Sequence, residues 1–181
     1  MKRFLGNSCA AGLVALMPLG AAAQCIDAFM TGLDEYEAGV RDSKPQFRTN
    51  ELLVLCFTPA QSGHVSVFDA PIKGDYQRLY PNALTHPGGE DSAQVSAGEE
   101  YCFGTRDTFP MYHPPDEGIG VGKISVILTS REDYQVSGDD YAIPGQVVPK
   151  ATMNLHLSNH KSGAAACSAR DVTFLEYLIT E

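Results

Sequence analysis

Residues 51–58 read ELLVLCFT. Successive side chains of a β-strand point to opposite faces, and in this stretch both faces are apolar. A strand that is apolar on both faces is covered on both sides, so we expect a central strand of a sheet here. One face would carry Leu53, Leu55 and Phe57, and the other Leu52, Val54 and Cys56.

Strand patterns recur along the rest of the chain. Residues 123–130 (KISVILTS) form the strongest one, because they are rich in β-branched and apolar residues. Turn-forming residues separate the segments, and regularly alternating helices are absent. We therefore expect a mainly β protein, an antiparallel β-sandwich, rather than a doubly wound α/β fold. The other expected strands are residues 64–69, 76–80, 100–104, 151–158 and 172–180, with loops at 83–98, 110–122 and 131–150.

One amphipathic helix is expected near the N-terminus, at residues 25–40 (CIDAFMTGLDEYEAGV). Its apolar residues recur at spacings of three and four, which places them on one stripe of a helix that would pack on the main body. We place this helix and a linker in residues 24–45, and a single β-sandwich domain in residues 46–181. The stripe consists of Ile26, Phe29, Met30, Leu33, Tyr36 and Val40.

The first 23 residues are typical of a secretory signal peptide. They have a basic start, Lys2 and Arg3, then an apolar core at residues 9–19 and a small-residue exit that ends at Ala23. The apolar core is shorter than the about 20 residues that span a bilayer. We expect cleavage after Ala23 and a mature protein that is periplasmic or secreted, without a membrane span. Lipid attachment at Cys25 is not expected, because it lacks the small preceding residue.

Four of the five cysteines lie beyond the expected cleavage site. An even number of cysteines in an oxidising compartment indicates two disulfides. Four cysteines allow three pairings, between which the sequence does not decide; we favour Cys56–Cys102 within the body and Cys25–Cys167 joining the ends. No close cysteine pair of the C-x-x-C type exists, which argues against structural zinc.

The charge balance excludes some partners. The chain has 22 acidic and 13 basic residues, a formal net charge of −9. Such a chain repels phosphate backbones and anionic lipid, so we expect no nucleic-acid partner. The hydrophobic content of 44% is that of an ordinary globular domain.

Residues from about 47 to 130 resemble a bacterial family known as domain of unknown function 4384. The most specific part is the run Leu79-Tyr80-Pro81-Asn82 that ends a strand after Phe68-Asp69. The other matching features are the strand at 51–55, the hairpin at 63–69, the turn at 73–75, Ala97-Gly98 and the last strand at 123–130. The resemblance implies an extracytoplasmic β-module, and it brings no catalytic residue with it.

Two groups of residues are candidates for binding. Arg78, Tyr80 and Asn82 belong to the strand end, where Pro81 and Asn82 also have a simpler role as strand terminator and turn former. Tyr101 and Tyr112 flank a region rich in aromatic residues, a type common at binding surfaces but also at the rims of cores.

Catalytic and metal signals are weak. His156 and His160 are four residues apart, a spacing that can hold a transition metal if a third ligand exists, but we favour the interpretation that they are two solvated histidines. The G-x-S-x-G elbow is absent. We expect no cofactor and no catalytic residue.

The leading hypothesis is an exported, non-catalytic module that binds another envelope protein or a small ligand. The alternative is a small extracytoplasmic hydrolase or metal-dependent enzyme, which needs a pocket with convergent histidine and acidic groups. A third hypothesis is a carrier of a small envelope ligand, which a cavity lined by the aromatic residues would favour.

Overall fold

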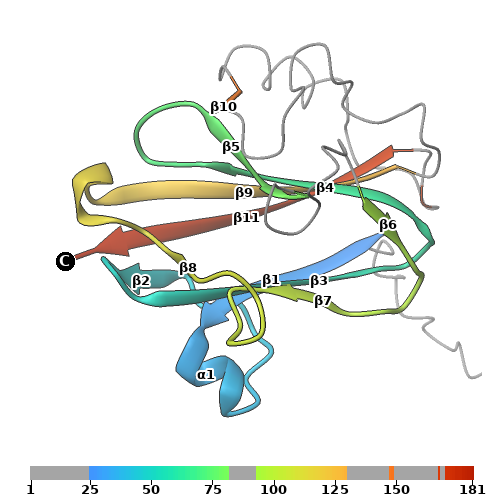
Figure 1. The fold of residues 1–181 in the computed structure, drawn as a ribbon, viewed down its shortest axis with the longest axis horizontal. Coiled ribbons are helices and arrows are strands. Elements are labelled where there is room, and N and C mark those ends of the chain that lie inside the picture. The colour runs from blue at the N-terminus through green and yellow to red at the C-terminus, as the bar shows by residue number, and fades with distance from the viewer. Residues whose placement is uncertain (1–24, 82–92, 130–146, 149–166, 168–169) are drawn as a thin grey trace, which may run out of the picture.

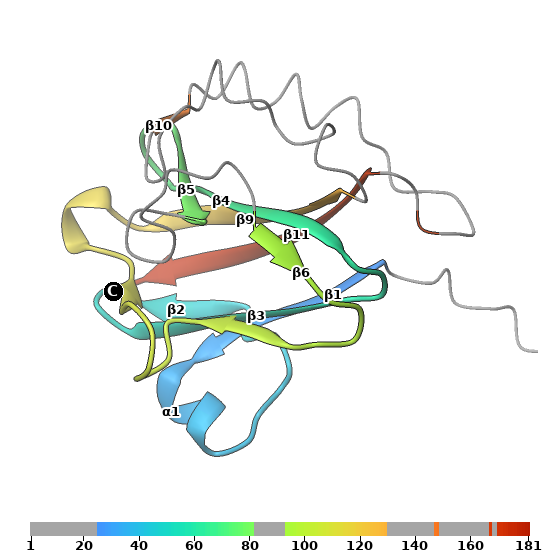
Figure 2. The same ribbon diagram turned by 45° about the vertical axis from the view of Figure 1, so that its right-hand side comes forward.

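The computed structural model describes residues 25–81, 93–129, 147–148, 167 and 170–181. The protein is mainly β and contains two sheets, which lie one above the other in Figures 1 and 2. Every described strand pair is antiparallel except one. The expected signal peptide, Asn82 and the strand at 151–158 lie outside the described residues.

The smaller sheet has four strands in the order β1-β3-β7, with β8 also paired to β3. The larger has seven strands in the order β10-β5-β4-β9-β11-β2, with β6 also paired to β4. The exceptional parallel pair is β2 with β11. The strands of the smaller sheet are β1 (Ile26–Gly32), β3 (Leu52–Pro59), β7 (Tyr101–Phe103) and β8 (Met111–Tyr112). Those of the larger sheet are β2 (Gln46–Arg48), β4 (Gly63–Ala70), β5 (Tyr76–Tyr80), β6 (Ala93–Val95), β9 (Gly120–Thr129), β10 (Val147–Val148) and β11 (Arg170–Thr180).

The main apolar core draws on both sheets. Strict alternation supplies it: β3 contributes every second residue from Leu53 to Phe57, and β4 contributes Val65 and Val67. Burying each such side chain stabilises the folded state by about 1.5–3 kcal/mol, so this cluster is the main stabilising feature. The largest fully buried members are Phe47, Phe57, Ile26, Met30, Leu55, Leu128 and Ile179.

The expectation of a central strand at residues 51–58 is met by β3. Its outward residues Val54 and Cys56 are both completely buried. They pack with Leu33 in a second cluster, on the face of the smaller sheet that turns away from the core. Helix α1 (Leu33–Glu37) covers that face (Figure 1). Both faces of β3 are thus apolar because a buried apolar cluster covers each of them.

The expected helix over residues 25–40 is wrong for most of its length. Residues Ile26–Gly32 form β1, which pairs with β3 from Ile26 opposite Pro59 to Gly32 opposite Leu53. Ile26 and Met30 face the main core, whereas Phe29 packs in the cluster under α1. Both faces of this strand are therefore apolar. The apolar residues of the two faces, taken together, produce spacings of three and four that resemble those of a helix. The helix is limited to five residues, Leu33–Glu37.

Short strands account for most of the other differences. The strands β6, β8 and β10 fall in segments expected to be loops, and β2 precedes the first strand expected in the β-sandwich domain. Each of these four strands has two or three residues. Such pairings depend on a neighbouring strand and leave little trace in local pattern. The longer strands β4, β5, β9 and β11 coincide with expected ones, although β9 begins earlier, at Gly120.

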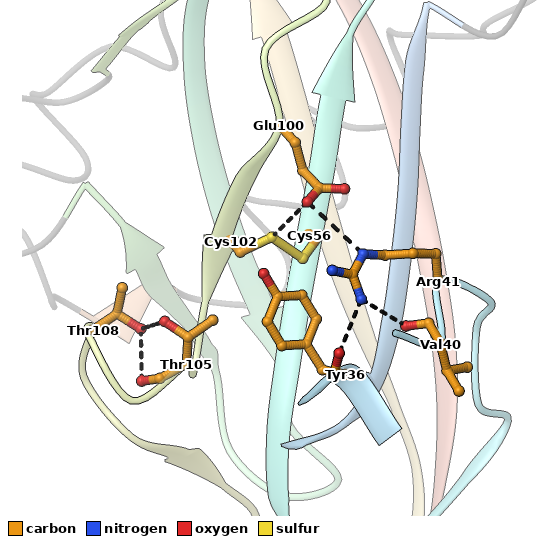
Figure 3. The surroundings of a disulfide bond; sticks show 8 residues. All are labelled: Tyr36, Val40, Arg41, Cys56, Glu100, Cys102, Thr105 and Thr108. Carbon is orange, nitrogen blue, oxygen red and sulfur yellow. Dashed lines mark hydrogen bonds and ion pairs between the residues drawn. A yellow bond between two sulfur atoms is a disulfide. The ribbon is translucent and has the colours of Figure 1, made fainter. Parts of the chain in front are cut away.

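Two disulfides join the cysteines in the favoured pairing, Cys56–Cys102 and Cys25–Cys167. Cys56 and Cys102 are directly opposite each other on β3 and β7, with Cα atoms 4.2 Å apart. Figure 3 shows this bridge beside Tyr36, with Oε1 of Glu100 3.6 Å from Sγ of Cys102. Two disulfides are compatible with an extracytoplasmic location. Among the described helices, none is long and apolar enough to cross a membrane.

Candidate ligand-binding site

A cavity of about 210 Å³ lies where the two sheets meet the segment from Phe109 to Glu117. The segment includes β8 and the short 3-10 helix Pro115–Glu117, and it forms one wall. The inner face of the larger sheet contributes further lining residues. The lining residues are Met30, Leu53, Asp69, Gln77, Leu79, Phe109, Pro110, Met111, Tyr112, His113, Pro114, Glu117, Ile124 and Tyr177.

Part of the lining of this cavity is apolar. Met30 and Leu53 come from the smaller sheet and Ile124 from the larger one, and all three are buried members of the main core. Leu79 and Phe109 pack against the same core from the periphery. The cavity is therefore an indentation of the hydrophobic core, and an apolar body placed in it would gain the same burial that holds the core together.

Asp69 is a carboxylate on the inner face of the larger sheet. On β4, Val65 and Val67 face the core, and Asp69 is the next residue with the same orientation. It is opposite Ile124 on β9, another core residue. Burying a carboxylate is costly unless polar partners compensate it. Here the hydroxyl of Tyr177 donates a hydrogen bond to Oδ1 of Asp69 over 2.9 Å.

Tyr177 reaches Asp69 because Gly122 lies beneath its ring. The two residues are paired across β11 and β9. A Cβ atom added to Gly122 would collide with the ring and hydroxyl of Tyr177. The missing side chain lets the ring lie over β9 and bring its hydroxyl to the next strand, β4. Gly122 therefore determines where the Tyr177 hydroxyl lies.

The surroundings keep the Tyr177 hydroxyl protonated. Burial is the largest cause that raises the pKa of Tyr177 above its ordinary value, since only 4% of the residue is exposed. The negative charge of Asp69, the hydrogen bond to Asp69 and the negative charge of Glu117 raise this pKa further. Both carboxylates thus act on the same hydroxyl, although they belong to different elements, β4 and the 3-10 helix. Tyr177 remains a neutral donor at ordinary pH.

His113 anchors the wall formed by the segment from Phe109 to Glu117. Its side chain is only 3% exposed. Nε2 lies 2.9 Å from the carbonyl oxygen of Gly118. Because a carbonyl only accepts, Nε2 carries the hydrogen and donates it. Nδ1 lies 3.4 Å from Oε2 of Glu117, and the backbone carbonyl of His113 accepts from the amide of Asn50. Both ring nitrogens are therefore directed at the residues of this wall rather than at a substrate.

A β-bulge arranges the edge of the cavity on β5. The pairing of β4 with β5 shifts between Val67 and Phe68, so that Val67 is opposite Tyr80 and Phe68 is opposite Arg78. Leu79 is the extra residue. After the shift Gln77 is opposite Asp69, and both line the cavity. Bulges commonly re-aim side chains beside functional sites.

A second, more open hollow lies beside α1, where Lys44 contacts the carboxylates of Glu35 and Glu51. The hydrogen bond from Lys44 lowers the pKa of Glu35. Burial of Lys44 lowers its pKa, whereas the hydrogen bonds and charges of the two carboxylates raise it, and the net result is a raised pKa. The charge of Lys44 is matched within the protein by Glu35 and Glu51.

The structure brings one of the five expected binding residues, Tyr112, to the cavity. Arg78 is buried with its guanidinium 5.4 Å from the ring centre of Phe68, which belongs to a different apolar cluster from the cavity residues. Tyr80 is a core residue. The ring of Tyr101 stacks on Phe57 at the core's periphery. Asn82 and the metal candidates His156 and His160 lie outside the described residues.

Sequence reasoning missed Asp69, Gln77, His113, Glu117 and Tyr177 as site residues. One signal was available for Asp69, which continues the apolar face of β4 as a charged residue. Its partner could not be found in the same way, because Tyr177 reaches it only through the order β4-β9-β11. The groups of residues that could hold a metal, among those described, both contain the two cysteines of a disulfide.

Comparisons with protein-family models, curated proteins and solved structures found no match for this chain. No relative therefore supplies a function for the cavity.

Proposed function

We propose that this protein is an exported, non-catalytic β-sandwich module of the bacterial envelope that binds a small ligand in the cavity between its sheets. The observation that carries the proposal is the cavity itself: an apolar interior of core residues with the polar pair Asp69 and Tyr177 at its wall. Ligand sites commonly combine an apolar lining with a few placed polar groups. The aromatic residues Phe109 and Tyr112 in its lining favour the carrier hypothesis over a purely protein-binding surface.

An enzymatic function is less well supported. A general base needs a nitrogen or carboxylate directed at the substrate. The histidine of the cavity has Nε2 on the Gly118 carbonyl and Nδ1 facing Glu117. This arrangement stabilises the wall and leaves His113 poorly placed to move a proton of a ligand. A hydrolase or metal-dependent enzyme remains the alternative.

The location forms part of the same proposal. The sequence at residues 1–23 and the two disulfides support export, and the resemblance of residues 47–130 to the family of domain of unknown function 4384 supports an extracytoplasmic module. Periplasmic location and membership of that family are therefore proposed together with the binding function.

The test is a screen of small fragments by amide chemical-shift mapping of the purified mature protein. We expect shifts that cluster at residues such as Leu79, Met111 and Ile124. Leu79→Phe should narrow the cavity and weaken binding, whereas Leu52→Phe, on an exposed side chain of β3, should leave it unchanged. Fragments that bind elsewhere only, or that bind Leu79→Phe equally well, would contradict the proposal.

A further inference from the structure

We propose that the Cys56–Cys102 disulfide is a site of thiol–disulfide exchange that a small thiol enters at Cys102. Access to it is controlled by a clasp of three side chains, those of Tyr36, Arg41 and Glu100. This inference is independent of the proposed binding function. It concerns the face of the smaller sheet that α1 covers, where the bridge joins β3 to β7.

The two sulfur atoms of this bridge differ in their access to solvent. Cys56 lies on the central strand β3 and is completely buried. Cys102 is only half-buried, and its strand β7 lies at the end of the order β1-β3-β7. A thiolate breaks a disulfide by attacking one sulfur atom that it can reach. The sulfur of Cys102 is therefore the point of attack.

The clasp is centred on Arg41. Its Nη1 donates to the backbone carbonyl oxygen of Tyr36 over 3.0 Å and to that of Val40 over 3.2 Å. The guanidinium carbon lies 4.2 Å from the centre of the Tyr36 ring. On its other side, Nε of Arg41 lies 4.0 Å from Oε1 of Glu100. Figure 3 shows how Arg41 in this way joins the end of α1 to the residue that precedes β7.

The clasp lies against the sulfur that a thiol would attack. Oε1 of Glu100 is 3.6 Å from Sγ of Cys102, a separation that leaves no room for another atom between them. The Tyr36 side chain packs against the apolar cluster that contains Cys56. A thiol therefore reaches Cys102 more readily after the side chains of the clasp have moved aside.

The clasp can open while the rest of the protein stays folded. The side chains of Arg41 and Glu100 are 45% and 43% exposed, and ion pairs with this exposure contribute little to stability. Neither residue belongs to the apolar clusters. Opening of the clasp is thus a local fluctuation of the kind that needs far less free energy than global unfolding.

The exchange reaction is that of a dithiol reductant with a protein disulfide. A thiolate of the reductant attacks Sγ of Cys102 and forms a mixed disulfide, while the electron pair of the broken S–S bond goes to Sγ of Cys56, which takes up a proton. The second thiol of the reductant loses its proton and attacks the reductant's own sulfur in the mixed disulfide. This step releases Cys102 as a thiolate, which is then protonated. The protein gains two electrons and two protons, and the reductant becomes a cyclic disulfide.

The experiment measures the initial rate at which dithiothreitol reduces the folded wild-type protein at fixed pH. Samples are quenched with acid, unfolded and alkylated, and peptide mass spectrometry follows the Cys56–Cys102 and Cys25–Cys167 bridges separately. We expect the Cys56–Cys102 rate to be proportional to the dithiothreitol concentration. It should hardly change at low urea concentrations, because local opening exposes little surface. A rate that is independent of dithiothreitol, or that rises steeply with urea, would mean that only global unfolding admits the thiol and would overturn the proposal.

Two variants of Arg41 separate the clasp from a simple effect of charge. Arg41→Gln should speed reduction of Cys56–Cys102 about fivefold, the factor expected for loss of an exposed ion pair. Electrostatic attraction alone predicts the opposite, since removal of a cation would slow an anionic thiolate. Arg41→Lys keeps the charge but loses the planar group that stacks on Tyr36 and bonds to two carbonyls, so it should speed reduction as well.

Arg106→Gln is the matched control. Arg106 also forms an ion pair with α1, through Glu37, and is 71% exposed, but it has no contact with the bridge among the interactions described. Its variant should leave the rate of Cys56–Cys102 unchanged. The Cys25–Cys167 bridge is the internal control, because its reduction rate should be the same in all of these proteins. A rate for Arg41→Gln at or below that of wild type would overturn the clasp, and so would an equal acceleration of both bridges.

Discussion

The hydroxyl of Tyr177 donates a hydrogen bond to Oδ1 of Asp69 over 2.9 Å, across 108 positions of sequence. The two residues belong to β11 and β4, which are separated by β9 in the larger sheet. The ring lies over β9 at Gly122, its cross-strand partner, which has no side chain. This bond links β11 to β4 across β9 at the cavity. It offsets the cost of burying a carboxylate that faces the core.

Replacement of Tyr177 by Phe should destabilise the protein although the ring remains. Asp69 would lose its hydroxyl donor in a partly buried position, at a cost of about 1.5–3 kcal/mol in the free energy of unfolding. Urea unfolding at neutral pH measures this loss. Tyr112→Phe is the matched control, because Tyr112 is 52% exposed, and its stability should stay within about 0.5 kcal/mol of wild type. Equal stability of both variants would mean that the bond contributes nothing.

Alkaline pH should destabilise the wild type through the same hydroxyl. The pKa of Tyr177 is raised in the folded protein, mainly by burial, whereas in the unfolded chain it is about 10. The folded state therefore retains a proton that the unfolded state loses. Its stabilising effect is complete below pH ~10 and falls above it by up to about 1.4 kcal/mol per pH unit.

Urea unfolding of wild type and Tyr177→Phe between pH ~9 and ~11 tests this prediction. The variant should lose less stability over that interval, so the two curves should converge. Some pH dependence should remain in the variant, because burial also raises the pKa of Tyr76. Parallel curves would show that Tyr177 titrates alike in the folded and unfolded states.

The parts of this structure that are encoded locally could be predicted from sequence. The alternation in residues 51–58 correctly indicates β3, because both of its faces are covered: Leu55 by the main core and Val54 by α1. Residues 26–32 have an apolar pattern compatible with strand and helix alike, and pairing with β3 decides it. That pairing is not visible in the residues themselves.

Most of the candidate site could not be predicted from the sequence. Tyr112 was found because aromatic residues are common at binding surfaces, but Asp69 and Tyr177 are ordinary strand residues until the strand order places them together. The bulge that brings Gln77 beside Asp69 is likewise a property of two paired strands. The sequence could thus predict the strands that form the cavity wall better than the contacts between them.

Gly122→Ala should be destabilising out of proportion to its size. The new Cβ would meet the ring of Tyr177 and force it or β9 to move. Overpacking of this kind costs about 1–3 kcal/mol. A double-mutant cycle with Tyr177→Leu separates this clash from other effects, since a smaller side chain at position 177 should relieve most of the cost. If the cost of Gly122→Ala is the same in both backgrounds, the ring does not depend on Gly122.

Removal of the Cys56–Cys102 disulfide should lower stability strongly. The bridge closes a loop with a sequence separation of 46, which corresponds to about 4 kcal/mol in the chain-entropy model. Cys56 is also fully buried beneath α1, so the Ala variant loses packing as well. Urea unfolding of Cys56→Ala/Cys102→Ala should therefore show a loss of at least about 4 kcal/mol, or a protein that is unfolded at ordinary temperature.

Glu100→Gln keeps the bridge and alters only the charge beside it, shown in Figure 3, so it should unfold like wild type. A loss below about 1 kcal/mol for the double variant would mean that packing of α1 against β3, and not the covalent link, holds this face together.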